Sequence, residues 1–263
     1  MKVRYALLVC AIIEGCGITA QQQPTATATI TQTASPQPNL TATHQANHAA
    51  TLTESAANSQ ALSTARAAPT VTAIAYAAHM LDEISNAAKN VAGVDVDDAV
   101  LLLGPRDGEI EDEDDDFVGI YETGLSLGDF VASIKFINPY DTATVGKWDY
   151  GLFFRHQADR QYRLAILSNQ SWTLLHWDRD DRTYIYRSND KNLTAKKGEE
   201  NAIWLIVINQ KAHLFINGIY AQTMDLGGGP SRGGLFPATG FYYGNASITG
   251  STSFREFTVW QLP

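Results

Sequence analysis

Short strand-forming runs fill the second half of this 263-residue chain and restrict its fold more than any other feature. From Phe117 onward, aromatic and β-branched residues come in short groups that Gly, Asn and Asp separate. This pattern is typical of β-strands joined by turns, and no helical period longer than a turn accompanies it. Roughly ten to twelve such strands are enough for two packed sheets. We therefore predict an all-β, two-sheet antiparallel sandwich over residues 117–263, whose first strand alternatively begins near residue 99.

The expected strands follow the clearest runs. They are residues 130–137, 150–156, 161–167, 171–177, 183–187, 203–208, 212–216 and 254–262. Asn217-Gly218 is a strong signal for a type I′ hairpin, because both central positions of that turn need positive φ. The glycine-rich stretch 227–234 has no following Lys-Ser/Thr. We therefore predict a loop there and not a phosphate-binding cradle.

The N-terminus has the order of a secretory signal. Residues 1–4 carry positive charge, residues 5–13 form an apolar run, and small residues follow. The run is too short to span a bilayer. Cys16 directly after Gly15 resembles the lipobox of bacterial lipoproteins. The resemblance implies that residues 1–16 are a lipoprotein-type signal peptide and that lipidated Cys16 anchors the protein outside a bacterial cell membrane. The alternative is cleavage after Ala20 and free secretion.

The segment after the signal does not have the composition of a folded domain. Residues 17–69 are rich in Ala and Thr, contain scattered prolines and have few large apolar side chains. They cannot bury enough surface to offset the entropy lost on ordering, so we predict a low-complexity linker or stalk. Cys10 and Cys16 are the only cysteines. A disulfide, a thiolate metal site and a cysteine nucleophile are therefore excluded from the mature domain.

Residues 70–93 are predicted to form an amphipathic helix. The apolar residues on its stripe, spaced by three and four, are Ile74, Ala77, Leu81, Ile84, Ala88 and Val91. Pro69 precedes the helix and Gly93 supplies its stop. A stripe of this kind needs a partner. Packing on the folded domain and self-association with a second copy are the two alternatives.

Negative charge is concentrated between the helix and the sandwich. Residues 95–116 hold eleven acidic residues and Arg106, which is more than the whole formal net charge of −9. This distribution argues against binding to nucleic acid. We predict an acidic, solvated neck over residues 94–116. The alternative is a structural calcium site, in which the alternating carboxylates of Asp112, Asp114 and Asp116 supply the ligands.

Several sequence elements resemble a known family. Trp148-Asp149-Tyr150-Gly151-Leu152-Phe153-Phe154-Arg155 and Gln161-Tyr162-Arg163-Leu164 look like paired strands of concanavalin A-like jelly rolls. Leu214-Phe215-Ile216-Asn217-Gly218 resembles an element of laminin G-like domains, and residues 254–259 resemble their final strand. The resemblance implies a concanavalin A-like lectin/glucanase jelly roll, a superfamily that includes lectin-like binders, adhesion modules and glucanases.

The catalytic pattern of the glucanase members is missing from the strands. Those enzymes carry Glu-x-Asp-x-Glu on one strand, where two carboxylates flank the glycosidic bond. Nothing after Phe117 matches it, and Glu109-x-Glu111-x-Glu113 has Glu at the central position. We therefore expect no catalytic residue and no enzymatic activity.

Aromatic and cationic residues on neighbouring strands are the better candidates for binding. Flat aromatic side chains pack on the apolar faces of sugars while polar groups fix their orientation. The predicted ligand-binding residues are Arg155, Tyr162, Trp172, Trp177, Tyr184 and Tyr186. Strand alternation places Tyr184 and Tyr186 on one face, and Trp172 and Trp177 on opposite faces unless a bulge intervenes. Half of the set must therefore belong to the core.

These features together predict a membrane-anchored extracytoplasmic lipoprotein. Its sandwich is expected to bind a carbohydrate or a cell-surface protein without a cofactor other than the alternative calcium ion. A glycan-processing hydrolase of the glucanase-like fold and a structural cell-envelope stalk remain as alternatives.

Overall fold

A computed structural model describes residues 70–112, 118–143, 145–179, 181–241 and 250–263, all within the unit Ala57–Pro263. The predicted signal peptide, Cys16 and the linker 17–69 lie outside these residues. The same holds for the calcium-ligand candidates Asp114 and Asp116 and for the side chain of Asp112.

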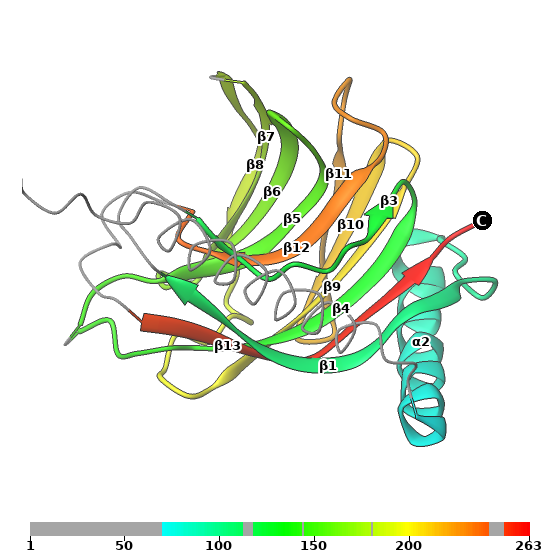
Figure 1. Cartoon of the computed structure of the whole chain (residues 1–263), viewed down its shortest axis with the longest axis horizontal. Helices are drawn as coiled ribbons and strands as arrows, with labels where there is room; N and C mark the ends of the chain where they lie inside the picture. The colour runs from blue at the N-terminus through cyan, green and yellow to red at the C-terminus, as the bar shows by residue number, and fades with distance from the viewer. Residues whose placement is uncertain (1–69, 113–117, 144, 180, 242–249) are drawn as a thin grey trace, which may run out of the picture. The chain divides into compact units, whose positions relative to one another are not determined.

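Two antiparallel sheets form the body of the domain, which confirms the predicted sandwich (Figure 1). The six-stranded sheet has the order β1 (Val100–Asp112), β13 (Gly250–Gln261), β4 (Phe130–Ile137), β9 (Glu200–Ile208), β10 (Lys211–Ile216), β11 (Ile219–Asp225). The seven-stranded sheet has the order β2 (Gly119–Ile120), β12 (Gly233–Thr239), β5 (Asp149–Gln157), β6 (Arg160–Leu167), β7 (Ser171–Asp178), β8 (Asp181–Asn189), and β3 (Ser126–Leu127) also pairs with β12.

The hydrophobic core lies between the two sheets, where alternate residues of each strand meet. Phe130, Ile134 and Leu205 of the six-stranded sheet are buried in one cluster with Leu152 and Leu164 of the seven-stranded sheet. The β10–β11 hairpin turns at Asn217-Gly218 with φ values of 51° and 76°. These values confirm the predicted type I′ turn.

Helix α2 (Val71–Ala92) packs on the other face of the six-stranded sheet, so part of this sheet is buried on both sides (Figure 1). Thr70 caps its N-terminus, and Gly93 ends it in the left-handed region with φ of 67°. Four buried residues of the helix pack against the sheet, namely Ala77, Met80, Ile84 and Ala88. They contact a cluster that includes Val131, Ile206, Phe215 and Trp260.

The packed stripe of α2 differs at both ends from the predicted one. Ile74 and Val91 are 48% and 55% exposed, whereas Met80, which the prediction left out, is buried. The helix therefore packs on its own domain through its middle turns. No helix in the described part of the chain is long and apolar enough to cross a membrane.

The predicted acidic neck is a strand over most of its length. Residues 100–112 form β1, so the alternative start of the first strand near residue 99 agrees with the structure. Ile110 is buried in the core, whereas its neighbours Glu109 and Glu111 are exposed. Within its sheet and among the described residues, β1 pairs only with β13, so it is an edge strand. Acidic side chains are compatible with such an edge because they project into water.

The predicted loop 227–234 ends earlier than expected, because β12 begins at Gly233. A Cβ atom on Gly233 would lie 2.4 Å from the carbonyl carbon of Arg155, so only glycine lets β12 approach β5 this closely. The two glycines and Pro237, which are typical of loops, are therefore part of a strand inside the sheet.

Candidate functional site

The outer face of the seven-stranded sheet, which points away from the six-stranded sheet, carries the candidate site. Strand register aligns Phe153, Arg163, Leu175 and Tyr184 in one row across β5, β6, β7 and β8. The next row places Trp177 of β7 beside Arg182 of β8. Side chains at paired positions point to the same face of a sheet. Residues from four strands therefore meet on this surface.

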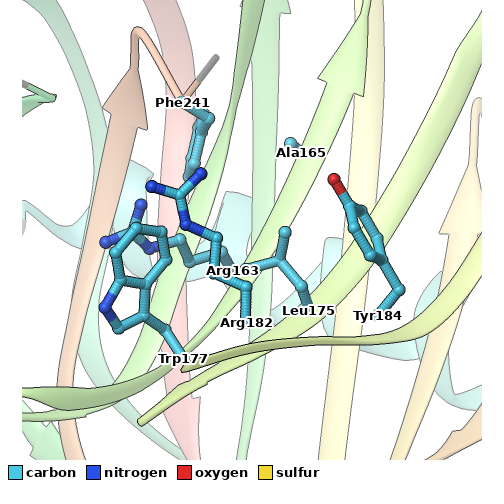
Figure 2. Close-up of a pocket in the computed structure, with 7 residues that line it drawn as sticks. All are labelled: Arg163, Ala165, Leu175, Trp177, Arg182, Tyr184 and Phe241. Atoms are coloured by element: carbon cyan, nitrogen blue, oxygen red, sulfur yellow. The ribbon is translucent and has the colours of Figure 1, made fainter. Parts of the chain in front are cut away.

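These two rows form a pocket, which we call the outer-face pocket. The lining residues are Arg163, Ala165, Leu175, Trp177, Arg182, Tyr184 and Phe241 (Figure 2). The volume of this open hollow, including the space open to solvent, is about 390 Å³. Figure 2 shows the Trp177 ring on one side and the Tyr184 ring on the other, with Leu175 between them.

Two guanidinium groups lie over the Trp177 ring. The guanidinium carbon of Arg163 is 3.7 Å from the ring centre, and that of Arg182 is 4.2 Å away. Arg163 also lies 4.8 Å from the ring centre of Phe153. Each such contact contributes about 0.5–1 kcal/mol at an exposed site. Trp177 therefore holds two positive charges at the pocket.

Tyr184 supplies the open aromatic surface. It is 52% exposed, and the guanidinium carbon of Arg187 lies 5.5 Å from its ring centre. Tyr184 stands on β8, the edge strand of this sheet. A ligand can therefore reach its ring from the pocket and from the sheet edge.

Phe241 contributes from the segment that follows β12. Its ring and the Phe153 ring pack edge to face, with centroids 5.0 Å apart. The Phe241 backbone N–H donates to a carboxylate oxygen of Asp149 at 2.7 Å. The Thr239 hydroxyl donates to the Asp149 carbonyl oxygen at 2.8 Å. Asp149, itself buried, thereby fixes where Phe241 covers the sheet.

A bulge separates the two tyrosines that alternation had placed on one face. Leu174 pairs with Tyr186 and Leu175 pairs with Tyr184, so the register shifts by one residue on β8. Tyr186 consequently stacks on the buried Trp172, with centroids 5.0 Å apart. The expected common face for Tyr184 and Tyr186 is therefore wrong. Because Trp177 lines the outer face and Trp172 belongs to the core, their predicted opposite placement agrees with the structure.

Three of the predicted ligand-binding residues are buried. Trp172 and Tyr162 belong to the core, and the Tyr162 hydroxyl donates to the Leu226 carbonyl at 2.8 Å. Arg155 is 1% exposed and has φ of 50° within an irregular stretch of β5. Its guanidinium donates to the Asp129 carboxylate at 3.1 Å and to the Asn209 carbonyl at 2.6 Å. The structure therefore leaves only Trp177 and Tyr184 of the predicted set at the pocket.

The list of six predicted ligand-binding residues did not include the two arginines of the pocket or Phe241. The Arg182 position had a sequence signal, because β7 and β8 follow each other closely in the chain, and Arg182 pairs with Trp177 next to the Asp178–Asp181 pair. Phe241 had no sequence signal, since it reaches the site from a connecting segment.

His156 also lies on this sheet. Burial, assisted by Arg163 and opposed by Glu122, lowers the pKa of His156.

No metal-binding cluster accompanies the site in the part of the chain that the structure describes. There, no group of three or more His, Cys, Asp or Glu residues is arranged to hold an ion. The calcium hypothesis rests on Asp112, Asp114 and Asp116, whose side chains lie outside that part. It therefore stays a prediction.

Comparisons with known proteins return similarities of fold. No protein-family model matches the chain, and no curated protein matches it in sequence. A carbohydrate-binding module from Bacillus subtilis aligns over 59% of this chain and 96% of its own, with 10% identity and a TM-score of 0.45. A Bacillus subtilis protein of unknown function with a galectin-like fold aligns over 60% and 89%, with 13% identity and a TM-score of 0.43. Bacillus licheniformis β-glucanase aligns over 62% and 82%, with 8% identity and a TM-score of 0.42.

Proposed function

We propose that this protein binds a carbohydrate, without cleaving it, at the outer-face pocket. The observation that carries the proposal is the arrangement of Tyr184 and Trp177 around a hollow that also contains Arg163 and Arg182. A sugar ring offers an apolar face to an aromatic side chain and hydroxyl groups to guanidinium donors. The pocket supplies both kinds of surface within one site.

The small extent of the pocket favours a sugar over a protein partner. A stable protein interface needs about 800 Å² from each partner, with an apolar centre. Each partner contributes about 20–30 residues to such an interface, whereas the lining of the pocket contains seven described residues. A glycan chain lying across β7 and β8 fits the geometry better.

Binding without cleavage is supported by the chemistry of the lining. Glycoside hydrolysis uses two carboxyl groups on opposite sides of the scissile bond. Among the residues that the structure describes, the lining includes two arginines and no carboxylate. A glycan-processing hydrolase, the alternative function, would have to use acids from elsewhere in the chain. Release of reducing ends from a bound polysaccharide would establish that alternative.

We further propose that lipidated Cys16 anchors the protein outside the cell membrane. The basic, apolar and small order of the first residues supports this proposal. Metabolic labelling with a fatty acid tests it. The wild-type protein is expected to take up label and partition into detergent, whereas the Cys16→Ala protein is not. Equal partitioning of both proteins would contradict anchoring through this residue.

The experiment for the binding function compares two exposed residues on different sheets. Tyr184→Ala removes the open ring of the site, and Ile219→Ala removes a side chain of similar exposure, 51%, from β11. A glycan array followed by titration calorimetry should show saturable binding that Tyr184→Ala weakens at least about tenfold, which is about 1.4 kcal/mol. Ile219→Ala should bind like the wild type. Equal binding by all three proteins would place the ligand away from the pocket.

A further inference from the structure

We propose that Asp149 is a positioning residue for glycan binding, because it holds Phe241 in place as a wall of the outer-face pocket. Asp149 is 2% exposed, so it acts through Phe241 and does not contact the ligand itself. This inference rests on the proposed carbohydrate-binding function and adds the residue that shapes one side of the site.

Phe241 lies outside the strands of the sheet. It follows β12, which ends at Thr239, and its partly exposed ring lines the pocket (Figure 2). Ladder hydrogen bonds fix a residue within a strand, whereas a residue in a connection depends on other contacts. The contacts of the connecting segment therefore decide where the Phe241 ring lies.

Asp149 holds this segment on both sides of Gly240. Its carboxylate accepts from the Phe241 N–H at 2.7 Å, and its carbonyl accepts from the Thr239 hydroxyl at 2.8 Å. A carboxylate binds a backbone N–H more strongly than a neutral acceptor does. Gly240, with φ of 79°, turns the chain between these two hydrogen bonds. Two bonds to one buried residue therefore fix the direction in which the chain leaves β12.

The Phe241 ring is joined to the rest of the pocket through Phe153. The two rings pack edge to face, with centroids 5.0 Å apart and an interplanar angle of 86°. The guanidinium carbon of Arg163 lies 4.8 Å from the centre of the same Phe153 ring. A wall that is in place before the ligand arrives loses less entropy on binding than a mobile one. Asp149 therefore contributes to affinity by keeping Phe241 on Phe153.

A double-mutant cycle tests whether Asp149 acts through Phe241. The probes are cellohexaose, laminarihexaose and chitohexaose, and the tightest of them is titrated calorimetrically against each variant. Asp149→Ala should weaken binding about three- to tenfold, which is the effect of ordering one side chain, and Phe241→Ala should weaken it at least as much. In the Phe241→Ala background, Asp149→Ala should have no further effect, whereas a merely structural role would lower the affinity in both backgrounds.

A conservative variant and a matched control complete the series. Asp149→Asn keeps an oxygen that can accept from the Phe241 N–H, so it should restore most of the affinity that Asp149→Ala loses. If Asp149→Ala does not fold, the cycle is run with Asp149→Asn, whose smaller loss should again disappear in the Phe241→Ala background. Asp107→Ala should bind like the wild type, because the Asp107 carboxylate accepts from the Glu256 N–H at 3.0 Å on the other sheet. Circular dichroism and thermal melts check that each variant is folded.

A spectroscopic measurement without ligand reports on the ring directly. para-Fluorophenylalanine at position 241 supplies one fluorine nucleus for NMR. We expect its line to shift toward that of the unfolded chain in Asp149→Ala and to keep its position in Asp107→Ala. Identical lines in the wild type and in Asp149→Ala would overturn the positioning role, whichever probe binds.

The outcomes separate the two proposals. Binding that Tyr184→Ala weakens and Asp149→Ala does not would overturn the role of Asp149 and keep carbohydrate binding. An equal loss from Asp149→Ala with and without the Phe241 ring would also overturn this role. Binding of none of the probes or of the array glycans would overturn both proposals.

Discussion

The guanidinium carbon of Arg163 lies 3.7 Å from the centre of the Trp177 ring. Arg182 lies over the same ring at 4.2 Å. The two guanidinium groups therefore cover part of the Trp177 ring, and the main role of this ring is to position them. The open aromatic surface of the site belongs to Tyr184.

This division of roles predicts different effects for two Trp177 variants. Trp177→Ala removes both cation–π contacts and should lower the free energy of unfolding by about 1–2 kcal/mol and weaken glycan binding. Trp177→Phe keeps a ring of smaller size, so it should retain most of the binding. Urea unfolding and titration calorimetry measure the two effects. Identical behaviour of the Ala and Phe variants would contradict a positioning role for the ring.

Local sequence was sufficient for most of the fold. Residues 130–137 were predicted with the bounds of β4, because β-branched and aromatic residues fill that strand. β1 was missed over its acidic half, since charge hid the alternation around Ile110. β12 was missed because local rules assign Gly233 and Pro237 to loops, although the close approach of β5 requires glycine at position 233.

The site was less predictable than the fold, because it depends on register and bulges. Pairing of Arg163 with Leu175 and Tyr184 is a property of three strands and not of one segment. The bulge on β8 turns Tyr186 inward, and the positive φ of Arg155 accompanies its burial. No Gly or Pro marks the bulge of β8 or the position of Arg155 in the sequence.

Arg155 should be among the most sensitive positions for stability. Arg155→Met removes the partner of Asp129 and the donor to the carbonyls of Gly128 and Asn209. Breaking a buried ion pair from one side costs about 3–5 kcal/mol. The loss should lie toward the lower end of that range, because Asp129 is 25% exposed and still accepts from the Asn209 N–H. Arg179→Met is the control, because its pair with Asp159 has an arginine side chain that is 79% exposed. It should change the free energy of unfolding by less than about 1 kcal/mol. Equal losses in urea unfolding would show that the Arg155 pair is not structurally important.

The protein should lose stability as the pH decreases below the ordinary pKa of histidine, about 6.5. Burial, with a smaller effect of Lys211, lowers the pKa of His213, and its Nδ1 lies 2.7 Å from the Thr223 hydroxyl. Below about pH 6.5 the unfolded chain binds a proton that the folded protein does not bind, so stability decreases as pH falls through this window and is full above it.

The melting temperature measured between about pH 5 and pH 8 tests this linkage. His213→Gln should flatten part of the decrease below pH 6.5. The remaining slope is expected to come from His156 and His176, whose pKa values burial also lowers. A His213→Gln curve parallel to that of the wild type would exclude His213 as a contributor.

The packing of α2 predicts how its apolar residues differ. Ile84 is fully buried against the six-stranded sheet, so Ile84→Ala should lower the free energy of unfolding by about 2–5 kcal/mol. Val91, on the same predicted stripe but 55% exposed, should tolerate alanine within about 0.5 kcal/mol. If the stripe serves the domain and not a second copy, both variants sediment at the same mass as the wild type. A dimer that Val91→Ala or Ile74→Ala dissociates would favour self-association through the exposed ends of the helix.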